Sequence, residues 1–535
     1  MRKRMMLYTV LLAPAAILAV LHQPDAPAGR RTFHIDGTAG SDANDGRSPQ
    51  KAWKTLDKVN GTVFEAGDRI LFKSGTRYQG QLKPRGSGRF VNGRALPIVV
   101  DQYGAGNKPR IDAEGKFEAA LHLYNVEYWE VNNLELTNLG AEPGVKRKGA
   151  FVQLEDYGSG SHIHLKNLYV HDVNGTARKA DGASGGIRWQ TQGKVKNSRL
   201  NGLLIENCHI RRCERDGIMG AGHRQRGVDW YPSLNVVIRK NLIEEVPGDG
   251  IVPIACDGPL VEHNVMRKCT RLLPEGDAAA GMWPWACDNA VFQFNEVSDH
   301  KAPWDAQGFD SDWDCRGTII QYNYSHDNEG GFLLVCNNGG APANIGVNDS
   351  TIVRYNISLN DGLRTQKTQS KGYFSPVFHI SGPVKSTKIY NNVVVVPKKP
   401  DVNIDRTMIY MDNWGGPWPE DTWFANNVFY VDGETKYVWG GSKNHRFEHN
   451  VFFGTHTGGP DDPWAVRKDP LFAGPMTWGA GLGSLKGFML RPGSPAIRAG
   501  LPVSFNGGRD FWANRLPVGL PPSIGAHEFG TGGKD

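Results

Sequence analysis

Short apolar runs recur along most of this chain, and many of them carry an Asn at the same place. LVEHNVM, VFQFNEV and IVRYNIS are three examples. Gly and Pro are scattered through the whole sequence, which favours many short strands and turns over long helices. Self-similarity of this kind indicates a repeat architecture. The repeat Asn residues are 23 to 40 positions apart: Asn133, Asn167, Asn207, Asn241, Asn264, Asn295, Asn323, Asn356, Asn392, Asn427 and Asn450.

A recurring Cys, with a Gly before it, defines the register of the repeat. Cys256, Cys287 and Cys315 each precede a repeat Asn by eight residues. A Gly stands five to seven residues before each of these Cys residues and before Cys336. The unit is therefore a Gly, a short strand, a Cys, a turn, a second strand with Asn, and a loop of variable length.

Constant strands joined by a constant turn and a variable loop describe one coil of a parallel β-solenoid. A single coil cannot bury its own apolar face, but stacked coils share a continuous core. Identical residues then stack about 4.8 Å apart, so an Asn column can hydrogen-bond through its side-chain amides. We expect the Cys column to form a ladder of buried thiols, because this spacing exceeds the usual Cβ separation in a disulfide. A β-sandwich also contains short strands, but it does not explain the repeated eight-residue offset.

The two ends of the chain support the same interpretation. FHIDGTAGSDANDGRSPQKAWKTLDKVN and AGDRILFKSGTRYQG stand near the start, and DPLF, RPGSPAIRAG and SIGAHEFG stand near the end. With these segments and its repeats, the chain resembles the right-handed parallel β-helix proteins of the pectate-lyase-like superfamily, many of them secreted glycan-degrading enzymes. The resemblance implies an all-β fold, a right-handed parallel β-helix (solenoid) with an N-terminal capping helix. It specifies the fold strongly and the reaction weakly, because the superfamily includes lyases, hydrolases, epimerases and non-catalytic binders.

The first 28 residues are typical of a secretory signal. A basic start is followed by an uncharged apolar run over 5–21 and by Ala26-Pro27-Ala28, a small-residue cleavage site. We therefore expect a secreted or periplasmic protein. An uncleaved anchor is the alternative, because the apolar run is close to membrane-spanning length.

The remainder, residues 29–535, is expected to be one β-helix domain. Ala52, Trp53, Leu56 and Val59 fall on one face of the expected capping helix. The domain divides into an N-terminal cap and first coil (32–90), stacked coils (91–455) and a C-terminal closing segment (456–535).

Composition and charge narrow the function classes. Hydrophobic residues make up 39% and charged residues 22%, which excludes a disordered chain and a multi-span membrane protein. The net charge is +6, of which Arg2, Lys3 and Arg4 supply three, so the mature chain is only mildly basic. No nucleic-acid partner is expected, and no membrane partner beyond the signal segment. No cofactor motif is present, although calcium remains an alternative.

The strands between Gly and Cys carry the candidate chemistry. After each Gly the first residue is apolar and should point inward, so the second and fourth should point outward. This places Asp310 and Asp312 on the outside of one coil, beside Trp283 and Trp285 on the coil before it. Indole rings can pack against the apolar faces of sugars. Paired acids can provide acid–base catalysis for the cleavage of a glycosidic bond. The pKa values of two acids this close should also differ from each other. The spacing of the two acids fits either a retaining or an inverting enzyme.

Other residues flank this face. The same alignment places Arg188 outward on an earlier coil, and Leu333 and Val335 outward on a later one. The 298–308 loop delivers Asp305 and Gln307, and the 325–331 loop delivers His326, Asp327 and Glu329. Glu329 could be a third acid or the true proton donor, whereas His326 and Asp327 could simply form a turn. The segment 363–372 could overhang the cleft with Arg364, Lys367 and Lys371.

These residues predict a carbohydrate-active enzyme acting on a polysaccharide or oligosaccharide, with glycoside hydrolysis favoured. The runner-up is a lyase that cleaves a uronate-containing glycan by β-elimination; if calcium is bound, its ligands are expected to be Asp310, Asp312 and Asp314. A non-catalytic carbohydrate-binding protein is the third interpretation. The predicted catalytic residues are Asp310, Asp312 and Glu329, and the predicted substrate-binding residues are Trp283, Trp285, Arg188, Asp305 and His326.

Overall fold

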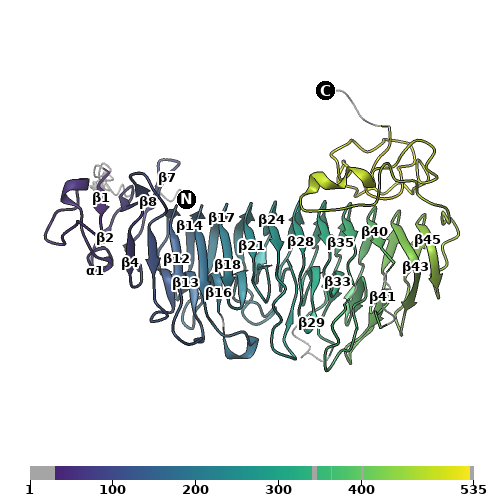
Figure 1. Ribbon diagram of the computed structural model, residues 1–535, viewed down its shortest axis with the longest axis horizontal. Coiled ribbons are helices and arrows are strands. Elements are labelled where there is room, and N and C mark those ends of the chain that lie inside the picture. Colours follow the sequence, from purple (N-terminus) through teal and green to yellow (C-terminus); the bar gives the residue numbers. More distant parts are fainter. Residues whose placement is uncertain (1–29, 183, 340–345, 363, 399–402, 531–535) are drawn as a thin grey trace, which may run out of the picture.

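The computed structural model describes residues 30–182, 184–339, 346–362, 364–398 and 403–530. Over these residues the chain winds into an elongated stack of coils (Figure 1). Each coil pairs in parallel with the next along the stack, so the predicted parallel β-helix is confirmed. The predicted signal segment, residues 1–28, lies outside the described part. Within the described part, no helix is long and apolar enough to cross a membrane.

Three parallel sheets run along the stack. Sheet 1 contains β1 (Thr32–Ile35), β3 (Arg69–Lys73), β8 (Ile98–Tyr103), β11 (Trp129–Asn132), β14 (Ser159–Lys166), β17 (Arg199–Glu206), β20 (Ser233–Arg239), β23 (Cys256–Asp257), β24 (Leu260–Glu262), β27 (Val291–Gln293), β31 (Ile319–Gln321), β35 (Ile352–Arg354), β39 (Lys388–Tyr390), β42 (Trp423–Ala425) and β44 (Arg446–Glu448). Sheet 2 contains β10 (Ala119–Tyr124), β13 (Lys148–Glu155), β16 (Gly185–Gln192), β19 (Asp216–Met219) and β22 (Ile251–Val252), and continues through bridges at Met282 to β30 (Gln307–Ser311), β33 (Gly331–Cys336), β37 (Phe378–Ser381) and β41 (Thr407–Asp412).

Sheet 3 follows sheet 1 in each coil, and sheet 2 follows sheet 3. It contains β4 (Arg77–Gln79), β9 (Arg110–Asp112), β12 (Glu135–Asn138), β15 (Tyr169–Val173), β18 (His209–Cys213), β21 (Leu242–Glu244), β25 (Val265–Arg267), β28 (Glu296–Ser298), β32 (Tyr324–His326), β36 (Ile357–Leu359), β40 (Val393–Val396), β43 (Val428–Val438) and β45 (Val451–Thr457). Short pairs outside the three sheets are β2 (Val63–Phe64) with β5 (Arg85–Gly86), β6 (Arg89–Val91) with β7 (Arg94–Leu96), β26 (Ala278–Ala279) with β29 (Trp304–Asp305), and β34 (Asn348–Asp349) with β38 (Val384–Lys385).

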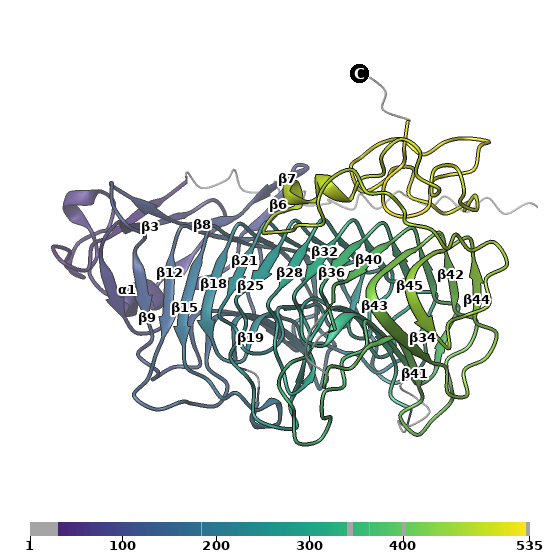
Figure 2. The same ribbon diagram turned by 45° about the vertical axis from the view of Figure 1, so that its right-hand side comes forward.

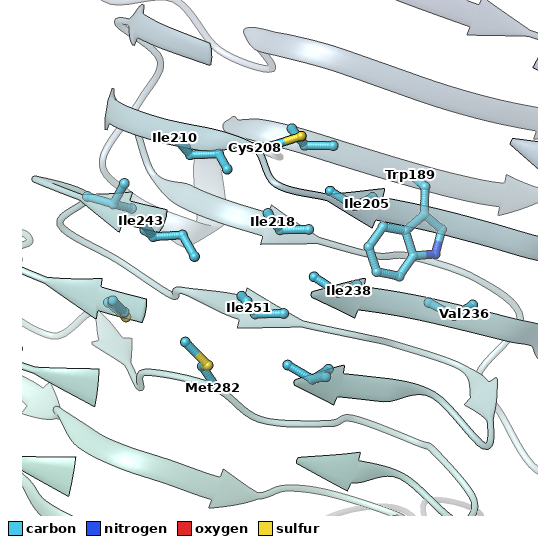
Figure 3. Packing of buried hydrophobic residues seen from close by; sticks show 14 of the residues in the cluster. Trp189, Ile205, Cys208, Ile210, Ile218, Val236, Ile238, Ile243, Ile251 and Met282 are labelled. Carbon is cyan, nitrogen blue, oxygen red and sulfur yellow. The ribbon is translucent and has the colours of Figure 1, made fainter. Parts of the chain in front are cut away.

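The core is a column of apolar side chains inside the coils. Ile218, Ile251 and Met282 follow one another in successive layers (Figure 3) and are fully buried. Phe309 continues this column on the next coil. The first position after Gly217, Gly250, Gly281 and Gly308 therefore points inward, as predicted.

The Asn ladder exists, but it begins later in the chain than predicted. From Asn241 to Asn450, each side-chain amide donates to the oxygen of the next Asn at 2.9 to 3.1 Å, and Asn450 donates to Asp462. In the preceding coil the ladder position is held by Cys208, whose backbone N–H donates to Asn241. Asn207 is therefore one residue off the column, on the exposed side of its turn.

The Cys column is only partly as predicted. Cys256, Cys287 and Cys315 are free thiols buried in the core, which confirms a thiol ladder without disulfides. Cys336 leaves that column. In the pairing of β30 with β33, Asp310 lies opposite Leu334, so Leu333 and Val335 point into the core and Leu334 and Cys336 point outward. The outward assignment of Leu333 and Val335 is therefore wrong by one residue, because Gly331 pairs with Gln307 and not with Gly308.

The N-terminal helix is shorter than the expected capping helix. Helix α1 spans Leu56–Asn60, with Thr55 as its N-cap and Leu56 and Val59 buried. Trp53 instead pairs with Ile35 at the end of sheet 1. The other short helices are 3-10 turns, η1 (Pro49–Lys51), η2 (Lys179–Asp181) and η4 (Leu482–Phe488).

Residues 459–530, called the C-terminal segment below, fold back over the outside of sheet 3 (Figures 1 and 2). Leu485 and Phe488 of η4 pack in one cluster with Tyr324 and Ile357 of the coils. The hydroxyl of Tyr324 donates to the carbonyl of Gly479 at 3.2 Å. This side of the stack is thus covered, and the side carrying β29, β33 and β41 lies opposite.

Candidate active site

Asp310 and Asp312 lie beside the tryptophan coil, as the repeat alignment predicted. The backbone N–H of Asp310 donates to the carbonyl of Met282 at 3.3 Å, and that of Asp312 donates to the carbonyl of Pro284 at 3.2 Å. Ser311 between them points inward, where its hydroxyl contacts that of Thr351 at 3.0 Å. Strand alternation therefore turns both carboxylates to the same outer side.

Both carboxylates line a pocket of about 360 Å³ on the outside of sheet 2. Its walls come from sheet 2 and from the loops on either side of it, and they combine acids, aromatic rings and basic groups. The lining residues are Lys179, Ala278, Pro303, Trp304, Asp305, Gln307, Asp310, Asp312, Trp313, Gly330, Leu334, Cys336, Arg364, Lys371, Phe374, His379 and Trp414.

The acids of the pocket differ in environment. Asp310 is 4% exposed, and its Oδ1 is buried without a hydrogen-bond partner among the residues that the structure describes. Burial, with repulsion from Asp312, Asp305 and Asp249, raises the pKa of Asp310 well above its usual range. Burial also raises the pKa of Asp312, to about 6, against the opposing effect of a hydrogen bond from Cys336. The pair therefore holds one proton near neutral pH, with Asp310 protonated and Asp312 ionised.

Cys336 is a partner of Asp312 rather than part of the core column. Its Sγ lies 3.1 Å from Asp312 Oδ1. Burial, with the nearby carboxylates, raises the pKa of the Cys336 thiol well above its usual range, so it stays a thiol and donates to the carboxylate.

The acids do not form the calcium set considered from the sequence. Oxygens of Asp310 and Asp312 converge with Cys336 Sγ, all within 4.8 Å of one another. Asp314 is not among the pocket residues, and its carboxylate instead pairs with Arg226 at 2.8 Å. A protonated thiol and two carboxylates, one of them protonated, do not fit a cation that takes six to eight oxygen ligands.

Basic groups enter the pocket from loops. Lys371 holds its ammonium 5.1 Å from the ring centre of Trp304. Arg364 is buried, and its guanidinium donates to the carbonyls of Asp305 at 3.0 Å and Phe374 at 3.2 Å. Arg364 therefore ties the two flanking loops together. Of the basic residues predicted to overhang the cleft from 363–372, Arg364 and Lys371 line the pocket and Lys367 does not.

The tryptophans predicted to bind sugar lie outside this pocket. Trp283 is 4% exposed and packs in an apolar cluster with Met219 and Val252, and its indole N–H donates to Asp249 at 3.0 Å. Trp285 packs against that cluster and makes an edge contact with Trp313 at 5.8 Å. The rings that do line the pocket are those of Trp304, Trp313, Phe374, His379 and Trp414.

Arg188 is also outside the pocket. It is buried on β16, several coils before β30, and donates to Asp216 at 2.6 Å. This ion pair belongs to a buried network in which Arg215 contacts both Asp216, at 3.3 Å, and Asp249, at 3.2 Å. The sequence pattern placed Arg188 on the outer side of its strand, but it did not reveal the ion pair with Asp216 that holds it there.

Glu329 and His326 lie elsewhere as well. Glu329 is buried beside Lys301, 3.0 Å from its ammonium, and does not line the pocket. His326 is on sheet 3, beneath the C-terminal segment. Its ring contacts Asp327 at 2.7 Å and Glu296 at 3.4 Å. Burial opposes its charge, but these carboxylates outweigh burial and raise the pKa of His326 to about 9.

His379 and Lys179 also line the pocket, and neither was predicted from the sequence. The pairing of β30, β33, β37 and β41 places Asp310, Leu334, His379 and Tyr410 in one column. Extending the repeat alignment beyond Cys336 would have found His379, whose ring nitrogen lies 3.3 Å from Asp412. Lys179 is the first residue of the 3-10 turn η2, in the variable connection before β16, where no repeat pattern exists to predict it.

Comparison with known proteins agrees with the fold. A family model described as a right handed beta helix region matches residues 185–362. The chain is a right-handed parallel β-helix protein. This β-helix protein is similar to a lacto-N-biosidase of Bifidobacterium longum subsp. longum, with 27% identity over 575 residues that cover 89% of this chain and 34% of the relative. It spans about a third of the length of that relative.

Two solved structures of one enzyme are similar as well. The β-helix protein matches the native form of a GH136 lacto-N-biosidase from Eubacterium ramulus with a TM-score of 0.57 and 26% identity, covering 78% of this chain and 68% of that one. The selenomethionine form of that enzyme matches with a TM-score of 0.55 and 24% identity, covering 80% of this chain and 68% of that one.

Proposed function

We propose that this β-helix protein is a glycoside hydrolase that cleaves an oligosaccharide or polysaccharide in the pocket on sheet 2. The observation that carries the proposal is the acid pair, Asp310 and Asp312, held side by side with different proton affinities in an aromatic pocket. One protonated and one ionised carboxylate are what hydrolysis of a glycosidic bond requires.

The mechanism follows from the ionisation of the pair. Asp310 donates its proton to the glycosidic oxygen as that bond breaks, and Asp312 attacks the anomeric carbon. Asp310, now ionised, then takes a proton from the water that releases the sugar from Asp312. An oxygen of Asp310 and one of Asp312 lie within 4.8 Å. This supports retention of configuration, because retaining enzymes have carboxyl groups about 5–5.5 Å apart and inverting enzymes about 6.5–9.5 Å apart.

Asp305 is the third carboxylate of the site. It lines the same pocket and is more exposed than Asp310. Burial raises its pKa, and its charge is one of those that raise the pKa of Asp310. We assign it to substrate binding and to the tuning of Asp310, and the variants below test whether it is itself the proton donor.

The aromatic walls provide the sugar-binding surfaces. Trp304, Trp313 and Trp414 take the role first predicted for Trp283 and Trp285, because they line the pocket and the latter pair does not. Indole rings bury the apolar faces of sugars, and Gln307 and Lys371 offer polar contacts to hydroxyl groups. The named relatives are lacto-N-biosidases, which supports an oligosaccharide substrate for this chain. We further propose that the protein acts outside the cytoplasm, as its N-terminal sequence predicts.

The test is a product screen on oligosaccharide substrates with the wild-type protein and three variants. Asp310→Asn and Asp312→Asn should each lower kcat/KM by about 10²–10⁴-fold, the usual contribution of an acid–base group. Asp305→Asn should mainly raise KM. Loss of activity in Asp305→Asn with activity kept in Asp310→Asn would transfer the proton-donor role to Asp305.

The products separate the alternative functions. New reducing ends without the absorbance of an unsaturated uronate support hydrolysis. That absorbance would instead establish a lyase. Binding without products from any substrate would establish a carbohydrate-binding protein.

A further inference from the structure

A second group of converging side chains lies far from the pocket, on the outer side of sheet 1. Glu130 stands on β11, and His162 and His164 stand on β14 in the next coil. A carboxylate oxygen of Glu130 and one ring nitrogen from each His all lie within 4.8 Å of one another. Each of the three side chains is 21% to 23% exposed, so a dissolved ion can reach them.

The backbone explains why these three groups meet. Glu130 and His164 are directly paired residues of adjacent parallel strands, so their side chains leave the sheet on the same side. Ile163, between the two His residues, is buried in the core, which turns both imidazoles outward. Their ring centres are 3.8 Å apart.

The hydrogen bonds around Glu130 leave one of its oxygens facing the imidazoles. Lys166 donates to Oε2 at 3.0 Å. Oε1 lies 2.9 Å from His162 Nε2 and 3.7 Å from His164 Nδ1. These separations are close to those between two ligands of one metal ion, whose bonds are about 2.0–2.2 Å long. Lys166 would then orient the carboxylate through its hydrogen bond to Oε2, as residues that hydrogen-bond to metal ligands do in metal sites.

We propose that Glu130, His162 and His164 form a binding site for a divalent transition metal, with Zn²⁺ as the expected ion. Two imidazoles and one carboxylate match the ligand types of zinc, whereas calcium and magnesium prefer oxygen ligands alone. The bound ion links two successive coils near the N-terminal end, many coils away from the proposed active site (Figure 1).

The test uses untagged full-length protein, freed of metal with a chelator and then titrated with ZnCl₂ by calorimetry. A binding event of one Zn²⁺ per chain is expected, and it should disappear in His162→Asn and in His164→Asn and weaken in Glu130→Gln. The matched control is His209→Asn, which removes a surface His that contacts a single carboxylate, Glu244, at 2.9 Å. This control should bind Zn²⁺ as the wild type does.

A second measurement guards against variants that fail to fold. Added Zn²⁺ should raise the Tm of the wild type and of the control, but not that of a His164→Asn protein with a wild-type circular dichroism spectrum. The absence of Zn²⁺ binding to the wild type, or equal binding by both His variants, would overturn the proposal. Neither outcome depends on whether the protein hydrolyses glycosides.

Discussion

Asp312 and Cys336 form a contact that sets the ionisation of the site at the scale of single residues. A thiol that donates to a carboxylate stabilises the ionised form, and here it opposes the burial that raises the pKa of Asp312 to about 6. Activity should therefore rise with pH through about 6, as Asp312 loses its proton. It should fall again at higher pH, as Asp310 loses the proton that it must donate.

Cys336→Ala should move the acidic limb of this profile to higher pH. The variant loses the hydrogen-bond donor to Asp312, so the pKa of that carboxyl group rises. At a pH below this pKa, kcat/KM falls about tenfold if the acidic limb moves by a full pH unit. Cys336→Ser keeps an O–H donor and should restore the limb toward its wild-type position. The measurement is kcat/KM between about pH 4 and 9, a range that brackets the ordinary pKa of a carboxyl group and that of a thiol. An unchanged limb in the Ala variant would show that the contact has no influence on Asp312.

The Asn ladder holds the turns together at the scale of strands and coils. Asn295 is fully buried, accepts from the backbone N–H of Asn264 at 2.9 Å and donates to the carbonyl of Val261 at 2.9 Å. Asn295→Ala leaves buried backbone groups without these partners, at a cost of about 1–3 kcal/mol for each group. We expect the free energy of unfolding, measured by urea titration, to fall by at least about 2 kcal/mol.

A surface amide contact between coils provides the control for the ladder. Asn201 accepts from Asn235 at 2.8 Å, and both amides remain in contact with solvent. Asn201→Ala should change the free energy of unfolding by less than about 0.5 kcal/mol. Equal losses in Asn201→Ala and Asn295→Ala would mean that the buried ladder adds nothing beyond an ordinary contact between coils.

The start of the ladder marks the limit of what repeat spacing predicts. From Asn241 onward the amide that the pattern identifies is the one that stacks. At Asn207 the same pattern is shifted by one residue, and Cys208 takes the buried position instead. A one-residue shift exchanges the buried and exposed sides of a turn. Sequence spacing alone cannot detect this shift, because an exposed Asn also suits the left-handed conformation that Asn207 adopts there, with φ of 54°.

His326 makes the stability of sheet 3 depend on pH. Its pKa is raised to about 9 by Asp327 and Glu296, against the effect of burial, whereas the pKa of an unfolded His is about 6.5. The stabilisation from this charge is complete below about pH 6.5 and is lost as pH rises through about 9. The difference between the two pKa values corresponds to a loss of about 3 kcal/mol in the free energy of unfolding. His326→Gln should remove that part of the pH dependence, and an identical dependence in both proteins would refute the assignment.

At the scale of the whole molecule, the sequence predicts the solenoid well and the pocket only in part. The floor of the pocket follows from the repeat, which placed Asp310 and Asp312 together on an outer strand. Its walls come from loops that vary between coils, such as those carrying Lys179, Trp304 and Arg364. Loop length and composition follow no period, so contacts between loops of different coils have no signature in spacing. For the same reason Arg188 and Glu329 were placed near the site although buried ion pairs hold them elsewhere.

The β-helix also has two flanks with different roles. The C-terminal segment covers the outside of sheet 3, whereas the pocket residues lie on the opposite flank, and none of them comes from that segment. Phe488 is fully buried between the segment and the coils. Phe488→Ala should lower the free energy of unfolding by about 3–5 kcal/mol, the usual cost of removing a buried Phe side chain. Because the pocket does not depend on this contact, kcat/KM of the folded variant at room temperature should stay within about twofold of wild type.

Phe505→Ala is the control for this separation, because that ring belongs to the same segment but is 70% exposed. It should change stability by less than about 0.5 kcal/mol and leave kcat/KM unaltered. Urea unfolding and steady-state kinetics on both variants check the argument together. A folded Phe488→Ala protein that has lost most of its kcat/KM would mean that the C-terminal segment supports the pocket through the coils between them, and the two flanks would then have to be treated as one cooperative unit.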